Sequence, residues 1–106
     1  IQLRQTNAGN KYLKNISVHI LINNAAIARG KLFSELSFEE YKKTIDVNFL
    51  SYVQMTHLFL NQKVIDDKNH ILNVISIAGM QGMTSSRNSD YGASKQALTS
   101  FNDSLR

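Results

Sequence analysis

Two apolar runs, separated by one long helical pattern, constrain the fold of this chain most strongly. Residues 16–22 (ISVHILI) and 71–77 (ILNVISI) are nearly continuous apolar stretches rich in β-branched residues. Such runs are typical of strands that are buried on both faces of a sheet. Each run gives way to small or polar residues, NNAA after the first and AG after the second. The sequence therefore predicts two buried strands whose ends are similar.

The segment between the two runs predicts a long amphipathic helix. Ser37 and Glu40 have the spacing of a capping box, which marks a helix start. Mostly apolar residues then recur at alternating steps of four and three, as on one face of a helix: Tyr41, Ile45, Asn48, Tyr52, Met55 and Phe59. This pattern predicts a helix from about Phe38 to about Gln62. A polar turn is expected at residues 66–69.

A second helix is predicted after the second strand. It begins near Ser89 or Asp90 and carries Ala97, Leu98, Phe101 and Leu105 on its apolar side. The order strand, helix, strand, helix is typical of an α/β fold with a parallel sheet. Ligands bind to such sheets beyond the carboxyl ends of the strands. We therefore expect one ligand crevice at that edge.

Composition excludes several classes of function. The chain has 106 residues and no cysteine, so it has no disulfide framework and no thiolate nucleophile. No apolar run approaches the ~20 residues that span a bilayer, and no metal site is predicted. Five basic residues and no acidic residue occur in the first 31 positions: Arg4, Lys11, Lys14, Arg29 and Lys31. A solvated segment explains them better than a nucleic-acid site, so no nucleic-acid partner is expected.

Two polar residues stand at positions where chemistry is possible. Asn48 lies on the apolar face of the long helix, and a buried amide needs hydrogen-bond partners. It either ties the helix to a neighbouring loop or serves a site. Ser76 lies near the end of the second strand, and no histidine is suitably placed to make it a nucleophile. Its hydroxyl remains a candidate for contact with a substrate oxygen.

The sequence YGASK places Tyr91 four residues before Lys95. On a helix, residues four apart lie on the same face. A free tyrosine has a pKa of about 10, and a cation within about 4–6 Å of a phenol favours the phenolate. Such a tyrosine exchanges protons with an alcohol or ketone near neutral pH. The same spacing also arises on any solvated helix, so the pair by itself leaves both interpretations open.

Taken in order, these motifs resemble the short-chain dehydrogenase/reductase family. The NNAG motif of that family corresponds to Asn23, Asn24, Ala25 and Ala26, with Ala26 in place of the usual glycine. The catalytic asparagine, serine, tyrosine and lysine correspond to Asn48, Ser76, Tyr91 and Lys95. The segments around NNAA and DYGASK look most similar to the branch of retinol and hydroxysteroid dehydrogenases. The resemblance extends from about Val18 to Arg106.

The resemblance implies a Rossmann-type doubly wound sheet and a role for each motif. Tyr91 would be the general acid/base, and Lys95 would favour its ionisation and bind the nicotinamide ribose. Ser76 would orient the substrate oxygen, and Asn48 would hold a water in a proton relay towards Lys95. The backbone of residues 24–26 would approach the cofactor, NAD or NADP. The expected reaction interconverts an alcohol and a ketone or aldehyde, with a retinoid, steroid or other lipid-like substrate as one expectation.

The resemblance also implies that more chain belongs to the domain. The sequence begins at Ile1, and its five glycines do not form the Gly-rich phosphate loop, which precedes the first strand in the family. We therefore expect residues 1–106 to be the central part of a larger domain that forms a homo-oligomer. Membrane attachment through a preceding segment stays open. The alternative is a non-catalytic relative that acts through protein–protein contacts.

Overall fold

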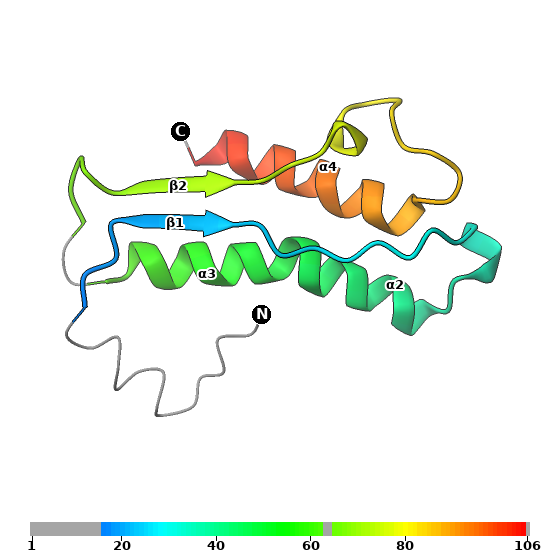
Figure 1. Ribbon diagram of the computed structural model, residues 1–106, viewed down its shortest axis with the longest axis horizontal. Coiled ribbons are helices and arrows are strands. Elements are labelled where there is room, and N and C mark those ends of the chain that lie inside the picture. Colours follow the sequence, from blue (N-terminus) through cyan, green and yellow to red (C-terminus); the bar gives the residue numbers. More distant parts are fainter. Residues whose placement is uncertain (1–15, 63–64, 106) are drawn as a thin grey trace.

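The computed structural model describes residues 16–62 and 65–105, and strands and helices alternate along this part of the chain (Figure 1). Arg4, Lys11 and Lys14 of the basic segment lie outside the described residues. The main elements are β1 (Ile20–Asn23), α2 (Phe38–Ile45), a π-helical turn (Asp46–Leu50), α3 (Ser51–Leu60), β2 (His70–Asn73) and α4 (Ser89–Ser104). Short 3-10 turns occur at Phe33–Glu35 and Ile77–Gly79. The predicted order is confirmed.

Strands β1 and β2 pair in parallel, from Ile20 opposite His70 to Asn23 opposite Asn73. Each strand has four residues, fewer than the apolar runs predicted. The first run begins outside the ladder because side chains bind its backbone: the carbonyl of Val18 accepts from Gln62 and Asn69. The second run ends early because a 3-10 turn begins at Ile77. The predicted strand lengths are therefore too long.

The predicted burial of both strand faces is wrong for the described chain. Leu21 and Asn23 are buried, but Ile20 and Ile22 are each 59% exposed. The alternation shows that the described helices cover only one face of β1. In a doubly wound sheet, other helices cover the second face. The exposed apolar residues on that face, Ile20 and Ile22, are suited to contact with such helices.

The long helix is confirmed, with its predicted start. Ser37 Oγ accepts from the Glu40 N–H at 3.1 Å, and the Glu40 carboxylate accepts from the Ser37 N–H at 3.1 Å. The helix runs from Phe38 to Leu60, but the stretch Asp46–Leu50 is π-helical. A π turn is a rare local widening that is frequent at functional sites. The polar turn at residues 66–69 is also confirmed by a hydrogen bond from Asn69 N–H to the Asp66 carbonyl.

Helix α4 begins at Ser89, as predicted, and packs against α2 and the π turn. Its first turn is joined to α2 by a hydrogen bond of 2.6 Å from Thr44 Oγ1 to Asp90 Oδ2. The side chains that are buried most completely include only two large nonpolar or aromatic ones, Tyr52 and Leu98. The rest are polar. None of the described helices is long and apolar enough to cross a membrane.

Candidate active site

Tyr91 and Lys95 lie on the first two turns of α4 and face each other, as the sequence predicted. The Lys95 Nζ is 5.8 Å from the centre of the Tyr91 ring. Tyr91 is half-buried, whereas Lys95 is only 2% exposed. The alternative of two side chains on a solvated helix face is therefore wrong for the lysine. Their catalytic roles stay a prediction.

Lys95 is a buried cation at the carboxyl end of β2. Its Nζ donates to the main-chain carbonyl of Val74 at 3.0 Å, just beyond the last residue of the strand. Burial lowers the pKa of Lys95 below its ordinary value because desolvation disfavours the charged form. A buried ammonium is costly unless polar groups surround it, so its position at a strand end needs a reason.

Asn48 lies in the π turn and is completely buried. Its side-chain amide binds the backbone of Ile27 in both directions: Oδ1 accepts from the N–H at 2.8 Å, and Nδ2 donates to the carbonyl at 2.8 Å. Nδ2 also donates to Ser94 Oγ at 3.1 Å, and Ser94 Oγ donates to the Tyr91 carbonyl at 2.6 Å. The amide therefore ties the long helix both to the loop after β1 and to α4.

Ser76 precedes the 3-10 turn Ile77–Gly79, three residues beyond the end of β2. Its Oγ accepts from the Ala78 N–H at 3.2 Å. The turn packs tightly on α4, because a Cβ on Gly79 would lie 2.8 Å from the Lys95 carbonyl oxygen. Only glycine permits this approach, and it brings the segment of Ser76 against the helix of Tyr91 and Lys95.

The glycine within YGASK also has a steric reason. A Cβ on Gly92 would clash with the side chain of Thr84. Thr84 comes from the loop between Ser76 and Tyr91, and its hydroxyl donates to the Ala78 carbonyl at 3.1 Å. This packing fixes the middle of that loop against the first turn of α4.

The loop after β1 exposes Asn24, Ala25 and Ala26, the residues predicted to approach a cofactor. Two side chains of the long helix bind this loop. Asn48 binds Ile27, and the Tyr52 hydroxyl donates to the Ala25 carbonyl at 2.9 Å. The loop is thus fixed on one side and open on the other. The open side of this backbone is therefore accessible to a ligand.

Sequence reasoning placed Tyr52 only in the helix stripe and missed its position beside the site. Its ring centre is 5.4 Å from the Lys95 Nζ. Burial raises the pKa of Tyr52, and the nearby Tyr91 phenol acts in the same direction. Sequence reasoning also missed the buried Thr44–Asp90 hydrogen bond, for which no local pattern gave a signal.

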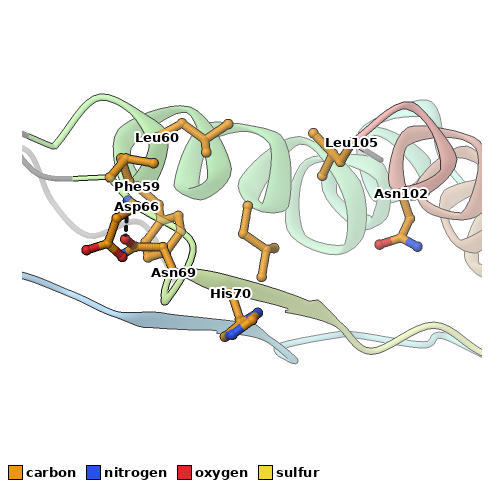
Figure 2. Close-up of a pocket in the computed structure, with 9 residues that line it drawn as sticks. Phe59, Leu60, Asp66, Asn69, His70, Asn102 and Leu105 are labelled. Carbon is orange, nitrogen blue, oxygen red and sulfur yellow. Dashed lines mark hydrogen bonds between the residues drawn. The ribbon is translucent and has the colours of Figure 1, made fainter.

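Two pockets of the described surface lie away from these residues. One, of about 360 Å³, is at the amino end of β2, between the ends of α3 and α4 (Figure 2). Figure 2 shows Phe59 and Leu60 on one side, Asn102 and Leu105 on another, and the Asp66–Asn69 turn beside them. The other, of about 450 Å³, lies around Phe33 and Phe38. Neither is lined by Asn48, Ser76, Tyr91 or Lys95, so neither is the predicted crevice.

Comparison with known proteins gives a consistent result. The family model described as short chain dehydrogenase matches residues 5–106. Epidermal retinol dehydrogenase 2 of Homo sapiens is 38% identical over 88 residues, which are 83% of this chain and 28% of that protein. The NADPH-dependent 1-acyldihydroxyacetone phosphate reductase of Schizosaccharomyces pombe is 36% identical over 92 residues, which are 87% of this chain and 30% of that protein.

A solved structure agrees with these sequence relatives. The structure titled 4-hydroxyisoleucine dehydrogenase complexed with NADH and succinate is similar with a TM-score of 0.81 and 28% identity. The match covers 93% of this chain and 42% of that one. The chain thus spans under half of the proteins that it matches here.

Proposed function

The chain belongs to the short-chain dehydrogenase family, and we propose on that basis that the protein is an NAD(P)-dependent oxidoreductase. It interconverts an alcohol and a ketone or aldehyde. Residues 1–106 form the central part of its catalytic domain. The observation that carries the proposal is the buried Lys95 ammonium 5.8 Å from the Tyr91 ring. The ammonium and the phenol thus lie on one face of α4, as proton transfer by Tyr91 with support from Lys95 requires.

Tyr91 transfers the proton in the proposed mechanism. In the direction of reduction, its phenol donates a proton to the substrate oxygen; in oxidation, the phenolate removes the proton from the alcohol. When NAD or NADP is bound, its nicotinamide supplies or accepts the hydride. Lys95 stabilises the phenolate throughout, because its charge is held on the same helix face.

Ser76 orients the substrate oxygen. Its Oγ already accepts a hydrogen bond from the Ala78 N–H, so the position of the hydroxyl is fixed while its own proton remains to be donated. A hydroxyl that donates to the substrate oxygen polarises a carbonyl and stabilises the negative charge that develops on it.

Lys95 and the loop after β1 are the groups proposed to hold the nicotinamide end of the cofactor. The Lys95 ammonium has three protons, and Val74 accepts one of them. The others are donors for the ribose hydroxyls and for a relay water. The exposed backbone of residues 24–26 fits the close approach of the cofactor. The names of the similar proteins mention NADH and NADPH, which supports a nicotinamide dinucleotide and leaves the choice between the two open.

Asn48 positions the proton relay. Its Oδ1 accepts from the Ile27 N–H, and its Nδ2 donates to the Ile27 carbonyl and to Ser94 Oγ. Both Nδ2 protons are therefore used and the side chain is completely buried, so we assign the relay water to a main-chain oxygen of the π turn. A π turn departs from the regular hydrogen-bond register of a helix, which favours such a contact.

The substrate is proposed to be hydrophobic. Ile77, Met80 and Met83 follow Ser76 and are 71%, 58% and 55% exposed. Methionine side chains adapt to irregular apolar ligands. The names of two relatives point to retinol and to an acyl-carrying phosphate ester, and both molecules have long apolar portions.

We also propose that the protein forms a homo-oligomer. Leu50 and Leu58 of the long helix are 47% and 42% exposed, so they are available for contact with a second copy.

The decisive experiment uses the full-length protein with Tyr91→Phe, which removes the hydroxyl and keeps the ring. We expect turnover of a panel of hydrophobic alcohols to fall by about 10²–10⁴-fold, with NADH or NADPH binding, measured by fluorescence, unchanged. Tyr41→Phe is the matched control, because the Tyr41 hydroxyl contacts only the Ser89 carbonyl at 3.4 Å. Undiminished turnover in Tyr91→Phe excludes Tyr91 as the proton donor. A wild-type protein that binds neither dinucleotide favours the non-catalytic alternative.

A further inference from the structure

Lys95 is a buried cation without an acidic partner. Among residues 16–62 and 65–105, the ion pairs involve Arg29, Lys31 and Arg87 as cations, and Lys95 forms none. Its hydrogen bond to the Val74 carbonyl satisfies one of three protons. The groups that face the ammonium in the described structure are this carbonyl and two aromatic rings. Besides the Val74 carbonyl, the two aromatic rings are therefore the groups that can orient the ammonium.

Tyr52 supplies the second ring, from the neighbouring helix. It is 2% exposed and its ring centre is 5.4 Å from the Lys95 Nζ, slightly closer than the 5.8 Å of Tyr91. Both distances are within the ~6 Å at which an ammonium is attracted to the face of an aromatic ring. The attraction is strongest where water is excluded, as it is here. Lys95 thus lies near two tyrosine rings, one on α3 and one on its own helix.

The Tyr52 hydroxyl makes a separate contact. It donates to the Ala25 carbonyl at 2.9 Å, in the loop proposed to lie against the cofactor. Burial and the nearby Tyr91 phenol both raise the pKa of Tyr52, so its hydroxyl keeps its proton and remains a donor. Tyr52 is thus suited to hold neighbouring groups and not to exchange protons with substrate.

We propose that Tyr52 is a positioning residue of this site: its ring, with the ring of Tyr91, forms an aromatic seat that keeps the Lys95 ammonium directed at the phenol, and its hydroxyl fixes the loop at Ala25. The proposal rests on the proposed function, in which Lys95 serves Tyr91. Without the Tyr52 ring, the ammonium keeps the Val74 carbonyl but loses its contact on the α3 side. Its side chain then samples positions farther from Tyr91.

Two substitutions in the full-length protein separate the two contacts. Tyr52→Phe keeps the ring and removes the hydroxyl; Tyr52→Leu removes both. We expect Tyr52→Leu to lower kcat for alcohol oxidation about tenfold and to move the pH of half-maximal kcat upward, because the phenolate loses support. Tyr52→Phe retains the wild-type pH profile and kcat within about threefold, and weakens NADH binding about threefold to tenfold through the loop at Ala25.

Tyr41→Leu is the matched control. The Tyr41 ring packs on Phe33 with centres 6.3 Å apart, and its hydroxyl contacts α4 at Ser89. This substitution removes a partly buried tyrosine of the same helix pattern without touching Lys95. We expect lower thermal stability and an unchanged pH profile. A Tyr52→Leu variant with the wild-type kcat and pH profile overturns the proposal, and so does a Tyr52→Phe variant as impaired in kcat as Tyr52→Leu.

A measurement independent of activity distinguishes failure of this proposal from failure of the proposed function. In protein with isotope-labelled lysine, the ε-methylene resonance of Lys95 is expected to show an upfield ring-current shift and a nuclear Overhauser contact with the Tyr52 ring. Tyr52→Phe preserves the shift and Tyr52→Leu reduces it. Absence of the shift and of the contact in the wild-type protein refutes the seat, even if both variants fail to fold. An inactive protein that shows both signals refutes the function alone.

Discussion

The long helix and the turn that follows it bind the chain on both sides of β1 in the same way, through an amide side chain that pairs with a backbone N–H and C=O; we call these two contacts the Asn48 and Gln62 clasps. At the carboxyl end, Asn48 binds Ile27 at 2.8 Å in both directions. At the amino end, Gln62 binds Val18 at 2.9 and 2.7 Å. The hydrogen bonds are equivalent, but their surroundings are not. Asn48 is completely buried, whereas Gln62 is partly exposed.

The connections of the two clasps differ as well. Asn48 has a third hydrogen bond, to Ser94 on the helix of Tyr91 and Lys95. At the other end, the Val18 carbonyl that Gln62 binds also accepts from Asn69, which lines the pocket of Figure 2. An identical contact is thus structural support at one end and part of a buried polar network at the other. Burial, and not the contact type, marks the end with the proposed site.

The largest expected effect tests this difference directly. Asn48→Leu leaves the partly buried N–H and carbonyl of Ile27 without their partner and removes the buried bond to Ser94, so we expect the free energy of unfolding to fall by roughly 3 kcal/mol or more. Gln62→Leu is the matched change at the other clasp; Asn69 still donates to the Val18 carbonyl and water replaces the bond to the Val18 N–H, so we expect about 1 kcal/mol or less. Urea denaturation of the full-length variants measures both values. Equal losses at the two positions contradict the role given to burial.

A smaller effect is expected at the Thr44–Asp90 hydrogen bond. Thr44→Val keeps the shape of the side chain and removes the donor to a fully buried carboxyl group, at a cost of about 1–3 kcal/mol. Thr44→Ser retains the hydroxyl and serves as the control. The turn contact at the other end, from Asp66 N–H to Asn69 Oδ1, is exposed. Asn69→Asp keeps the Oδ1 acceptor of this contact and removes the Nδ2 bond to the Val18 carbonyl, which Gln62 still binds, and is therefore expected to cost about 1 kcal/mol or less; a cost equal to that of Thr44→Val counts against the comparison.

The smallest expected effect on stability is at Lys95. Burial lowers its pKa, so between that lowered value and 10.5 the unfolded chain holds a proton that the folded chain has released. Stability therefore rises with pH in this window and is reduced below it. Lys95→Met removes the cost of burying the charge, so stability at neutral pH stays unchanged or increases while turnover is lost. Denaturation of the wild-type and Lys95→Met proteins from pH 7 to 10.5 measures this pH dependence. A clear loss of stability in Lys95→Met at neutral pH refutes the expected cost of burying the charge.

Much of the fold followed from the sequence because its signals are local. The capping box at Ser37 and the start at Ser89 depend on neighbouring residues, and the parallel pairing follows from the order of strands and helices. The proximity of Tyr91 and Lys95 follows from helix geometry alone. The roles of Asn48 and Ser76 were assigned by family resemblance, and they stay predictions.

What the sequence did not predict depends on distant partners. Tyr52 fitted the apolar stripe, and its meaning lies in contacts with Ala25 and Lys95 that no local pattern encodes. The strand ends were misplaced because an apolar run continues beyond the residues that find a pairing partner. The exposed face of β1 has the same cause: the run shows that both faces are suited to burial, not which helices cover them.

The π turn at Asp46–Leu50 has a consequence for the loss of a residue from this segment. A widened turn is what a regular helix becomes when it takes in one extra residue while both flanks keep their direction. Losing that residue would restore an ordinary turn and leave α2 and α3 facing as they do. A deletion of one residue beside Asn48 is therefore expected to be absorbed within the helix, without a change in a connecting loop.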